Sequence, residues 1–559
     1  MAEIILPGTY VTVRDEALIS AGRVVTGNIG IVGTANKGPL NEVQILGSFS
    51  EARELFGSSD PWRGGSNNEL TLIRALEQIY NNGGKTVYAV RTSARNGGGI
   101  PLATAATYDI QSSSAGPVLT TLSAKSAGTW GTGIRIKVMA APSDQNSFVV
   151  EELTGSATAL RRNNIDQTSD LNSISVQKDD TGQLQRFTVI YTGTPAVGEV
   201  QIDPSNGNLT FEGTQVPVAA DTIFASYEVL AANTMNVEIS SGQILETYYI
   251  ADVAHLAEQV VANSSLVTAD SADADDPSLM GITPIATVPA GLLFSGGSDG
   301  ANAIAADYQD SVALLENEII NIVLLAGQDE SDAGMRTALS GHINATNQIQ
   351  RERIGLMGSA LDASLNAIAG HALNSDRIIY VAPGIKLANN QSLPGAYTAA
   401  AVAGLISSLP VQTSPTNKVL NVPDLENTFS TSQLEKLVLN RVLTVEKREG
   451  FRIVKGITTS TNSAWHQITT RRIVDFATYG VRSGCNPYIG KLNNERVRGA
   501  MKATLDAFLT RMVDNEALIS YELEVSATRA QQIAGEAIVT MTIRPTFSID
   551  FIKVTMYLG

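Results

Sequence analysis

The stretch Gly-Gly-Lys-Thr at residues 83–86 could do chemistry, because it matches the end of a phosphate-binding P-loop. That loop needs another glycine five residues before Gly84, where this chain has Ile79. It also needs a helix after the loop, so that the phosphate meets a helix N-terminus. Here the apolar spacing predicts a helix before the loop, over residues 72–80, and residues 86–90 favour a strand. We therefore interpret the two glycines as the turn that ends a helix.

A second candidate is the Gly-x-Ser-x-Gly pattern at residues 296–300, with Ser298 as a possible hydrolase nucleophile. A nucleophile elbow places its serine at a tight turn from a strand into a helix. In this chain the helical spacing begins only near Asp307, so a loop is the better interpretation. A serine hydrolase that uses Ser298 would need a nearby His and Asp, and it remains the minor alternative.

The remaining residue types that could act in catalysis form no recognisable constellation. The histidines are widely spaced in the sequence: His255, His342, His371 and His466. With one cysteine in the chain, a zinc site is not expected. Carboxylate pairs such as Asp179-Asp180 and Asp275-Asp276 lie in polar turns that offer no burial to separate their pKa values. The glycines of residues 128–133 have the wrong spacing for a dinucleotide loop. We therefore expect no catalytic, cofactor-binding or metal site.

The composition is that of a large globular protein. A chain of 559 residues is long enough for roughly three or four domains. The single cysteine, Cys485, excludes an intramolecular disulfide framework. The longest apolar runs fall short of the roughly 20 residues of a membrane span, and the first ten residues lack the pattern of a secretory signal. Direct membrane insertion is therefore not expected.

The net charge of −16 argues against general nucleic-acid binding, which depends on clustered Lys and Arg. The charge is unevenly distributed along the chain. Residues 151–280 contain 4 Lys and Arg against 19 Asp and Glu, whereas residues 441–511 contain 13 against 5. A charged run is usually a solvated face, but a contrast of this size suggests that the two regions have different neighbours.

The elements around these residues change in character along the chain. From about residue 100 to 245, short alternating segments between turn residues predict a β-rich, acidic insertion. From 300 to 410, apolar strands alternate with helices, which indicates a parallel sheet covered on both faces. An apolar stripe predicts a helix near 494–512. Residues 551–558 alternate as a strand does, with Ile552 and its alternate neighbours on one side.

Several segments, taken in order, resemble the contractile tail sheath proteins of myovirus-type bacteriophages and related contractile injection systems. They are LPGTYVTV (6–13), VVTGNIGIVGTANKGPLNEVQILGSFSEARELFG (24–57), GGKTVYAVR (83–91), LSAKSAGTWGTGIRIKV (122–138), LLFSGGSDGANAIAADYQDSVALLENEIINIVLLAG (292–327) and GVRSGCNPYIGKLNNERVRGAMKATLDAFL (480–509). The β-rich insertion is the part that departs from the family.

The resemblance implies an α/β multidomain fold that contains a subtilisin-like domain without catalytic residues. The expected domains are an N-terminal arm (1–22), the first part of the α/β core (23–100), an outward-facing β-rich insertion (101–245), the subtilisin-like α/β domain (246–450), an inner α+β C-terminal domain (451–546) and a C-terminal arm strand (547–559).

The resemblance also implies a mechanical function rather than an enzymatic one. The expected subunit polymerises as a helical sleeve around a tail tube and contracts to drive the tube through a cell envelope during genome or effector delivery. The implied partners are other copies of the chain, the tail tube protein, and the baseplate and tail terminator proteins. The implied location is the tail sheath of a virion, after assembly in the host cytoplasm. A sheath of a non-phage injection device fits the same residues and stays open.

Two groups of residues are the expected contact sites. In the family, terminal arms cross to neighbouring subunits and complete their sheets, because an isolated strand leaves backbone groups unpaired. The strand-exchange candidates are Tyr10, Val11, Val13, Ile552, Val554 and Met556. Pairing of both arms within their own chain is the alternative. The candidates for contact with an acidic tube or an adjacent subunit are Arg496, Arg498 and Lys502, at the start of the helix near 494–512.

Overall fold

The computed structural model describes residues 26–59, 70–269 and 285–557. The contacts divide the chain into two units. Unit 1 joins the beginning of the chain to its end, and comprises residues 1–35, 40–95 and 301–559. Unit 2 comprises residues 36–39 and 96–300. Each unit has hydrophobic cores of its own.

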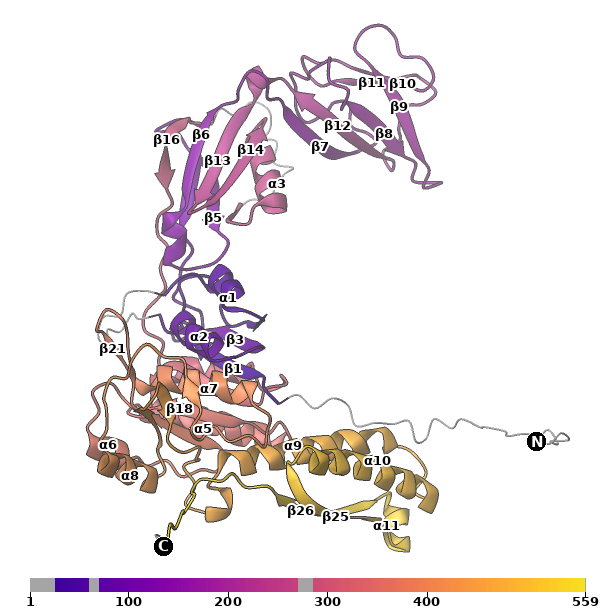
Figure 1. Ribbon diagram of the computed structural model, residues 1–559. Coiled ribbons are helices and arrows are strands. Elements are labelled where there is room, and N and C mark those ends of the chain that lie inside the picture. The colour runs from indigo at the N-terminus through magenta and orange to yellow at the C-terminus, as the bar shows by residue number, and fades with distance from the viewer. Residues whose placement is uncertain (1–25, 60–69, 270–284, 558–559) are drawn as a thin grey trace, which may run out of the picture. The chain divides into compact units, whose positions relative to one another are not determined.

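A nine-stranded sheet forms the centre of unit 1 within the described residues (Figure 1), in the order β2-β3-β1-β17-β18-β19-β23-β24-β22. Its strands are β1 (Ile29–Gly33), β2 (Val43–Leu46), β3 (Val87–Arg91), β17 (Ile322–Asp329), β18 (Ile354–Gly358), β19 (Ile378–Ala382), β22 (Val419–Leu420), β23 (Leu443–Lys447) and β24 (Phe451–Ile453). The six neighbours from β3 to β23 run parallel. Their side chains align in rows, such as the row that joins Ala89, Ile31, Leu324, Leu356 and Ile379.

Helices cover both faces of this sheet, as the apolar strands require. α2 (Leu72–Asn81) and α7 (Gly395–Ser408) pack on one face, and α4 (Ala305–Ala313) and α5 (Ala333–Gln348) pack on the other. The smaller elements are α1 (Phe49–Phe56), α6 (Leu365–Ala369), α8 (Thr431–Leu439), β20 (Ile385–Lys386) and β21 (Ser392–Leu393). The predicted parallel α/β sheet is confirmed.

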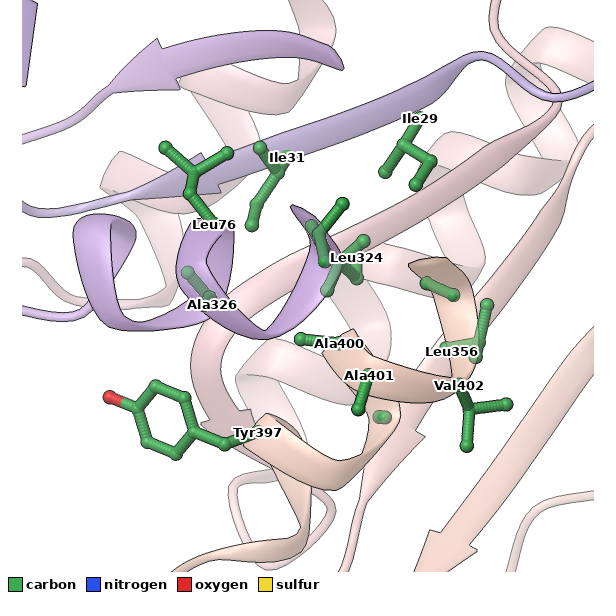
Figure 2. Close-up of a cluster of buried hydrophobic side chains, with 14 of the residues drawn as sticks. Ile29, Ile31, Leu76, Leu324, Ala326, Leu356, Tyr397, Ala400, Ala401 and Val402 are labelled. Carbon is green, nitrogen blue, oxygen red and sulfur yellow. The ribbon is translucent and has the colours of Figure 1, made fainter. Parts of the chain in front are cut away.

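The α7 helix is buried on nearly all sides because it is rich in alanine and glycine. Figure 2 shows Ala400 and Ala401 of α7 among apolar side chains of the sheet and of α2, including Leu324 and Leu76. A Cβ atom at Gly404 would lie 2.2 Å from the carbonyl oxygen of Ile79. The small residues therefore allow α7 and α2 to approach backbone to backbone.

The end of unit 1 is a helix pair with a hairpin against it. Its elements are α9 (Ile468–Cys485), α10 (Glu495–Asp514), α11 (Arg529–Ala534), β25 (Leu518–Ser526) and β26 (Ile538–Pro545). β25 and β26 pair antiparallel with each other. A Cβ atom at Gly480 would lie 2.0 Å from the ring of Phe508, so α9 and α10 cross closely at this glycine. The helix expected near 494–512 is confirmed as α10.

Unit 2 is built mainly of antiparallel sheet. A six-stranded sheet has the order β11-β10-β9-β8-β12-β7, a four-stranded sheet has the order β14-β13-β6-β16, and a third has the order β15-β5-β4. The elements are β4 (Thr107–Gln111), β5 (Val118–Ala124), β6 (Arg135–Ala140), β7 (Ser147–Thr154), β8 (Ser173–Gln177), β9 (Leu184–Ile190), β10 (Glu199–Ile202), β11 (Leu209–Phe211), β12 (Thr222–Val229), β13 (Met235–Ser241), β14 (Ile244–Ile250), α3 (Val253–Asn263), β15 (Val267–Ala269) and β16 (Val288–Leu293).

Two features differ from the sequence-based expectations. Unit 2 continues past the expected end of the β-rich insertion at residue 245, because β16 pairs with β6 and β15 pairs with β5 inside the unit. The expected subtilisin-like region (246–450) therefore begins in unit 2 and ends in unit 1. Residues 546–557 form no strand with any other described residues, although their sequence alternates as a strand does.

Candidate assembly surfaces

The C-terminal segment, residues 546–557, carries apolar side chains that the single chain does not bury. Ile552, Val554 and Met556, the candidates for strand exchange, are 81%, 76% and 86% exposed. The aromatic side chains of Phe551 and Tyr557 are also exposed. The segment thus has exposed apolar side chains, and its backbone belongs to no described sheet. Both features are typical of a strand that pairs with another chain. The other candidates for strand exchange, Tyr10, Val11 and Val13, lie outside the described residues, and their role stays a prediction.

The β25–β26 hairpin has two outer edges that no other described strand covers. One face of the hairpin packs half-buried residues, including Leu523 and Ile543, against α9 and α10. The other face presents Glu522, Thr540 and their alternate neighbours to solvent. An antiparallel hairpin with one packed face and open edges can accept a further strand on either side.

The three basic residues predicted to face a tube or a neighbouring subunit all lie on the first turns of α10. The Asn494 side chain caps this helix by accepting a hydrogen bond of 2.9 Å from the backbone N–H of Val497. Arg496 and Lys502 are exposed. Arg498 is half-buried, and its guanidinium donates to the side-chain oxygen (2.8 Å) and the carbonyl (3.2 Å) of Asn493.

Helix geometry separates this trio. Residues 498 and 502 are four positions apart and share one face of α10, whereas Arg496 projects from a different side. The structure therefore brings Arg498 and Lys502 together and leaves Arg496 apart from them. The sequence alone could have predicted this separation, because residues four positions apart share a helix face and residues two positions apart do not.

Part of the basic block of residues 441–511 points inward and holds α9 to the rest of unit 1. Asp475 accepts two hydrogen bonds from Arg377, at 2.8 and 3.0 Å, and one from Arg471, at 2.8 Å. Farther along α9, Arg482 forms an ion pair of 2.8 Å with Glu352. These arginines are therefore partners in internal ion pairs, which the sequence prediction of a charged surface missed.

Two of the four histidines, His255 and His342, are buried among polar partners. Burial, together with the nearby Arg162 guanidinium, lowers the pKa of His255 to about 4. Its ring nitrogen Nδ1 lies 3.1 Å from the hydroxyl of Ser147, which is also buried. Burial lowers the pKa of His342 to about 3, and its ring contacts the Arg353 guanidinium at 2.8 Å. Neither imidazole is open to a substrate.

Ser298 lies in a loop, as expected, and not at a strand-to-helix turn. Its backbone N–H donates to the carbonyl of Thr104, and its carbonyl accepts from the N–H of the same residue. Its hydroxyl oxygen accepts a hydrogen bond of 3.1 Å from the N–H of Gly300. The partners recorded for Ser298 are thus backbone groups of a loop, and a catalytic His is not among them. The glycines of residues 83–84 follow the end of α2, and Gly83 has a φ of 97°, so the P-loop interpretation remains excluded.

The described residues offer neither a metal-binding cluster nor a membrane-spanning helix. No group of three or more His, Cys, Asp or Glu side chains in the described ranges could hold a metal ion. Among the same residues, no helix has the length and apolar character needed to cross a membrane. The candidate surfaces described above are residues 546–557, the β25–β26 hairpin and the first turns of α10, and all of them lie near the C-terminal end of unit 1.

Comparisons with known proteins point to the same end of the chain. Residues 301–459 match the family model of the phage tail sheath protein central domain, and residues 460–559 match that of the phage tail sheath C-terminal domain. A tail sheath protein of Bacillus phage SP01 is 22% identical over 561 residues, which cover 93% of this chain and 90% of the phage protein.

Two crystal structures share the fold. The sheath tail protein from Desulfitobacterium hafniense superposes with a TM-score of 0.59 at 14% identity, covering 96% of this chain and 100% of that one. The sheath tail protein from Listeria innocua superposes with a TM-score of 0.58 at 13% identity, covering 95% of each chain. Residues 301–559 of this chain thus match the central and C-terminal domains of phage tail sheath proteins.

Proposed function

We propose that this protein is a contractile tail sheath subunit, which polymerises as a helical sleeve around a tail tube and contracts to drive the tube through a cell envelope. The match of residues 301–559 to the central and C-terminal domains of phage tail sheath proteins supports this proposal. The nine-stranded sheet would be the rigid body of the subunit, with a subtilisin-like arrangement that has lost its catalytic residues. The free energy of contraction would be stored in contacts between subunits.

The proposal rests mainly on one observation: the C-terminal arm belongs to no described sheet, and the β25–β26 hairpin has free edges to which such an arm could add. The apolar C-terminal segment is exposed from Phe551 to Tyr557, and the β25–β26 hairpin has uncovered edges. In a polymer, the arm of one subunit would add to the hairpin of another. The ladder hydrogen bonds would supply the affinity, and alternate side chains would set the register.

The remaining contacts follow from the charge distribution. The acidic β-rich insertion, expected over residues 101–245, would face outward. Arg496, Arg498 and Lys502 would face an acidic tube or an adjacent subunit. Exposed ion pairs are individually weak, at about 0–1 kcal/mol each, which suits a sleeve that must release its tube. Baseplate and tail terminator proteins would bind the two ends of the sleeve, in a virion tail assembled in the host cytoplasm.

Electron microscopy of the purified protein tests the proposal directly. Hollow sleeves or helical rods are expected from the full chain, and deletion of residues 1–20 or 547–559 should abolish them. A finer variant replaces Ile552, Val554 and Met556 with Asp, and a matched control replaces Lys553 and Thr555 with Ser. Sleeves are expected from the control only. Sleeves from the triple Asp variant would refute strand exchange by the C-terminal arm.

Co-assembly with a tube tests the role of α10. Replacing Arg496, Arg498 and Lys502 with Glu should weaken co-sedimentation with the tube, because three favourable contacts become repulsive. Replacing Arg529, on the neighbouring α11, with Glu is the control. If the triple variant binds the tube as the wild type does, these residues do not face it.

A sheath from a non-phage contractile injection system is the second candidate function. The crystal structures that share the fold come from bacterial sheath tail proteins, which favours keeping this candidate. Neighbouring genes for a capsid and portal would support a phage, whereas their absence beside tube and baseplate genes would support an injection device.

A further inference from the structure

The first turn of α9 lies where both terminal segments join unit 1. On the N-terminal side, the Arg472 guanidinium donates from Nη2 to the carbonyl oxygen of Thr26, at 3.3 Å. The same nitrogen donates to the carbonyl of Leu409, at 3.0 Å, and Nη1 donates to that of Pro410, at 3.3 Å. Arg472 therefore ties the first described residue to the chain that follows α7.

Two neighbouring residues fix this N-terminal junction further. A Cβ atom at Gly27 would lie 2.4 Å from the carbonyl oxygen of Ser407, so the chain passes directly against the end of α7. The Asn28 side chain donates to the carbonyl of Ile319, at 2.7 Å, and its backbone N–H donates to the side chain of Asn321, at 3.1 Å. The N-terminal arm thus has a defined root at residues 26–28.

The C-terminal segment has a comparable root. The Gln467 side chain, which directly precedes α9, donates from Nε2 to Asp550 Oδ2, at 3.3 Å. The Lys455 ammonium lies 3.7 Å from the same carboxylate oxygen, and 5.3 Å from the centre of the Phe551 ring. The side chains of Ile549 and of residues 551–557 are exposed. The chain has nine residues after Asp550, which can span at most about 30 Å when extended.

The helix that receives both roots is itself held firmly. Asp475, one turn beyond Arg471, accepts three hydrogen bonds from two arginines. The Arg471 guanidinium also stacks on Trp465, at 4.3 Å from the ring centre, and donates to Asp376, at 2.9 Å. A pull on either root would therefore act on an element that is connected to the central sheet by ion pairs.

We propose that residues 467–472 are a common anchor for the two terminal arms, through which tension passes from one neighbouring subunit to the next. The transmission of tension rests on the proposed sheath function, whereas the anchoring itself concerns the single chain. The anchor would also set the length of each arm that can reach a neighbour. Strand exchange could use only residues that precede Thr26 in the N-terminal arm and residues that follow Asp550 in the C-terminal arm.

Hydrogen–deuterium exchange on the single full-length chain tests the anchor. The variant Thr470→Gly loosens the first turn of α9, and Ser483→Gly is the matched control at the other end of the helix. We expect exchange to rise about threefold to tenfold in Thr470→Gly, both in the peptide over residues 26–31 and in that over 545–551. Ser483→Gly should leave both peptides near wild type. A rise in only one peptide, or equal effects of the two variants, would overturn a common anchor.

A second experiment separates the anchor from the proposed function. In sleeves, Arg472→Met and Asp550→Asn should each lower the urea concentration that dissolves the polymer. The double variant should lower this urea concentration little more than the stronger single variant does, because both substitutions weaken the same anchor. Additive effects would refute the shared anchor. If the wild type forms no sleeves, the transmission of tension is refuted together with the proposed function. The hydrogen–deuterium exchange result still tests the anchor.

Discussion

Asp475 is the residue on which the attachment of α9 most depends, and Asp475→Asn tests this. Its carboxylate accepts three hydrogen bonds from Arg377 and Arg471, whose side chains are only about 10% exposed, while its own is 16% exposed. A hydrogen bond to a charged group contributes about 1.5–3 kcal/mol. Removal of one partner from a buried ion pair costs about 3–5 kcal/mol.

For Asp475→Asn we expect a loss of about 2–4 kcal/mol in the free energy of unfolding of unit 1, since the partial exposure reduces the full effect of a buried pair. The asparagine carbonyl can still accept one bond, but its amide group then faces a guanidinium donor. Arg471 keeps Asp376 as a partner, at 2.9 Å, so the helix should loosen rather than unfold alone.

Urea denaturation followed by Trp465 fluorescence measures this loss, in a background with Trp62 and Trp130 replaced by Phe. Asp424→Asn is the control, because the Asp424–Lys447 pair is about half exposed. Because solvent screens this pair, its loss should change the free energy of unfolding much less than the loss of the Asp475 network. Equal losses from the two variants would refute the argument that the Asp475 network holds α9, since burial is the difference between them.

Three further predictions concern the core and the discarded active site. Because burial lowers the pKa of His342 to about 3, the unfolded chain takes up a proton below pH 6.5 that the folded chain takes up only near pH 3. Stability should therefore fall as the pH drops through this window, by up to about 1.4 kcal/mol per pH unit. His342→Gln should make this dependence shallower in urea titrations at pH 6.5, 5.5 and 4.5, and an unchanged slope would contradict the assignment. Gly404→Ala should cost about 1–3 kcal/mol, because its Cβ atom would meet backbone at 2.2 Å. Gly341→Ala, which has open space in α5, should stabilise by about 0.5–1 kcal/mol; thermal melts that show equal effects would count against close α2–α7 packing. A fluorophosphonate probe should label Ser298→Ala and wild-type protein equally, and labelling lost on substitution would revive the hydrolase.

The candidate site could be predicted from the sequence only in part. The alternation of Ile552, Val554 and Met556 marked an apolar arm, and the structure shows these side chains exposed. The number of Lys and Arg residues in 441–511 did not reveal which of them face inward. An arginine side chain is long enough to reach a buried carboxylate or solvent from the same backbone position, so its direction depends on what the fold places beside it.

The sequence by itself determined the local elements. The 3.6-residue spacing of apolar side chains predicted α2 and α10, and uninterrupted apolar runs predicted β17, β18 and β19. Such predictions succeed because the number of buried faces of an element determines the spacing of its apolar residues. Only the tertiary structure decided that β1 pairs with β17, where Asn28 and Asn321 meet across 293 positions. It also decided that residues 246–269 and 285–300 pack within unit 2, and that Thr26 and Asp550 both contact residues at the start of α9. Such long-range pairings depend on the mutual fit of whole surfaces, which no local pattern in the sequence specifies.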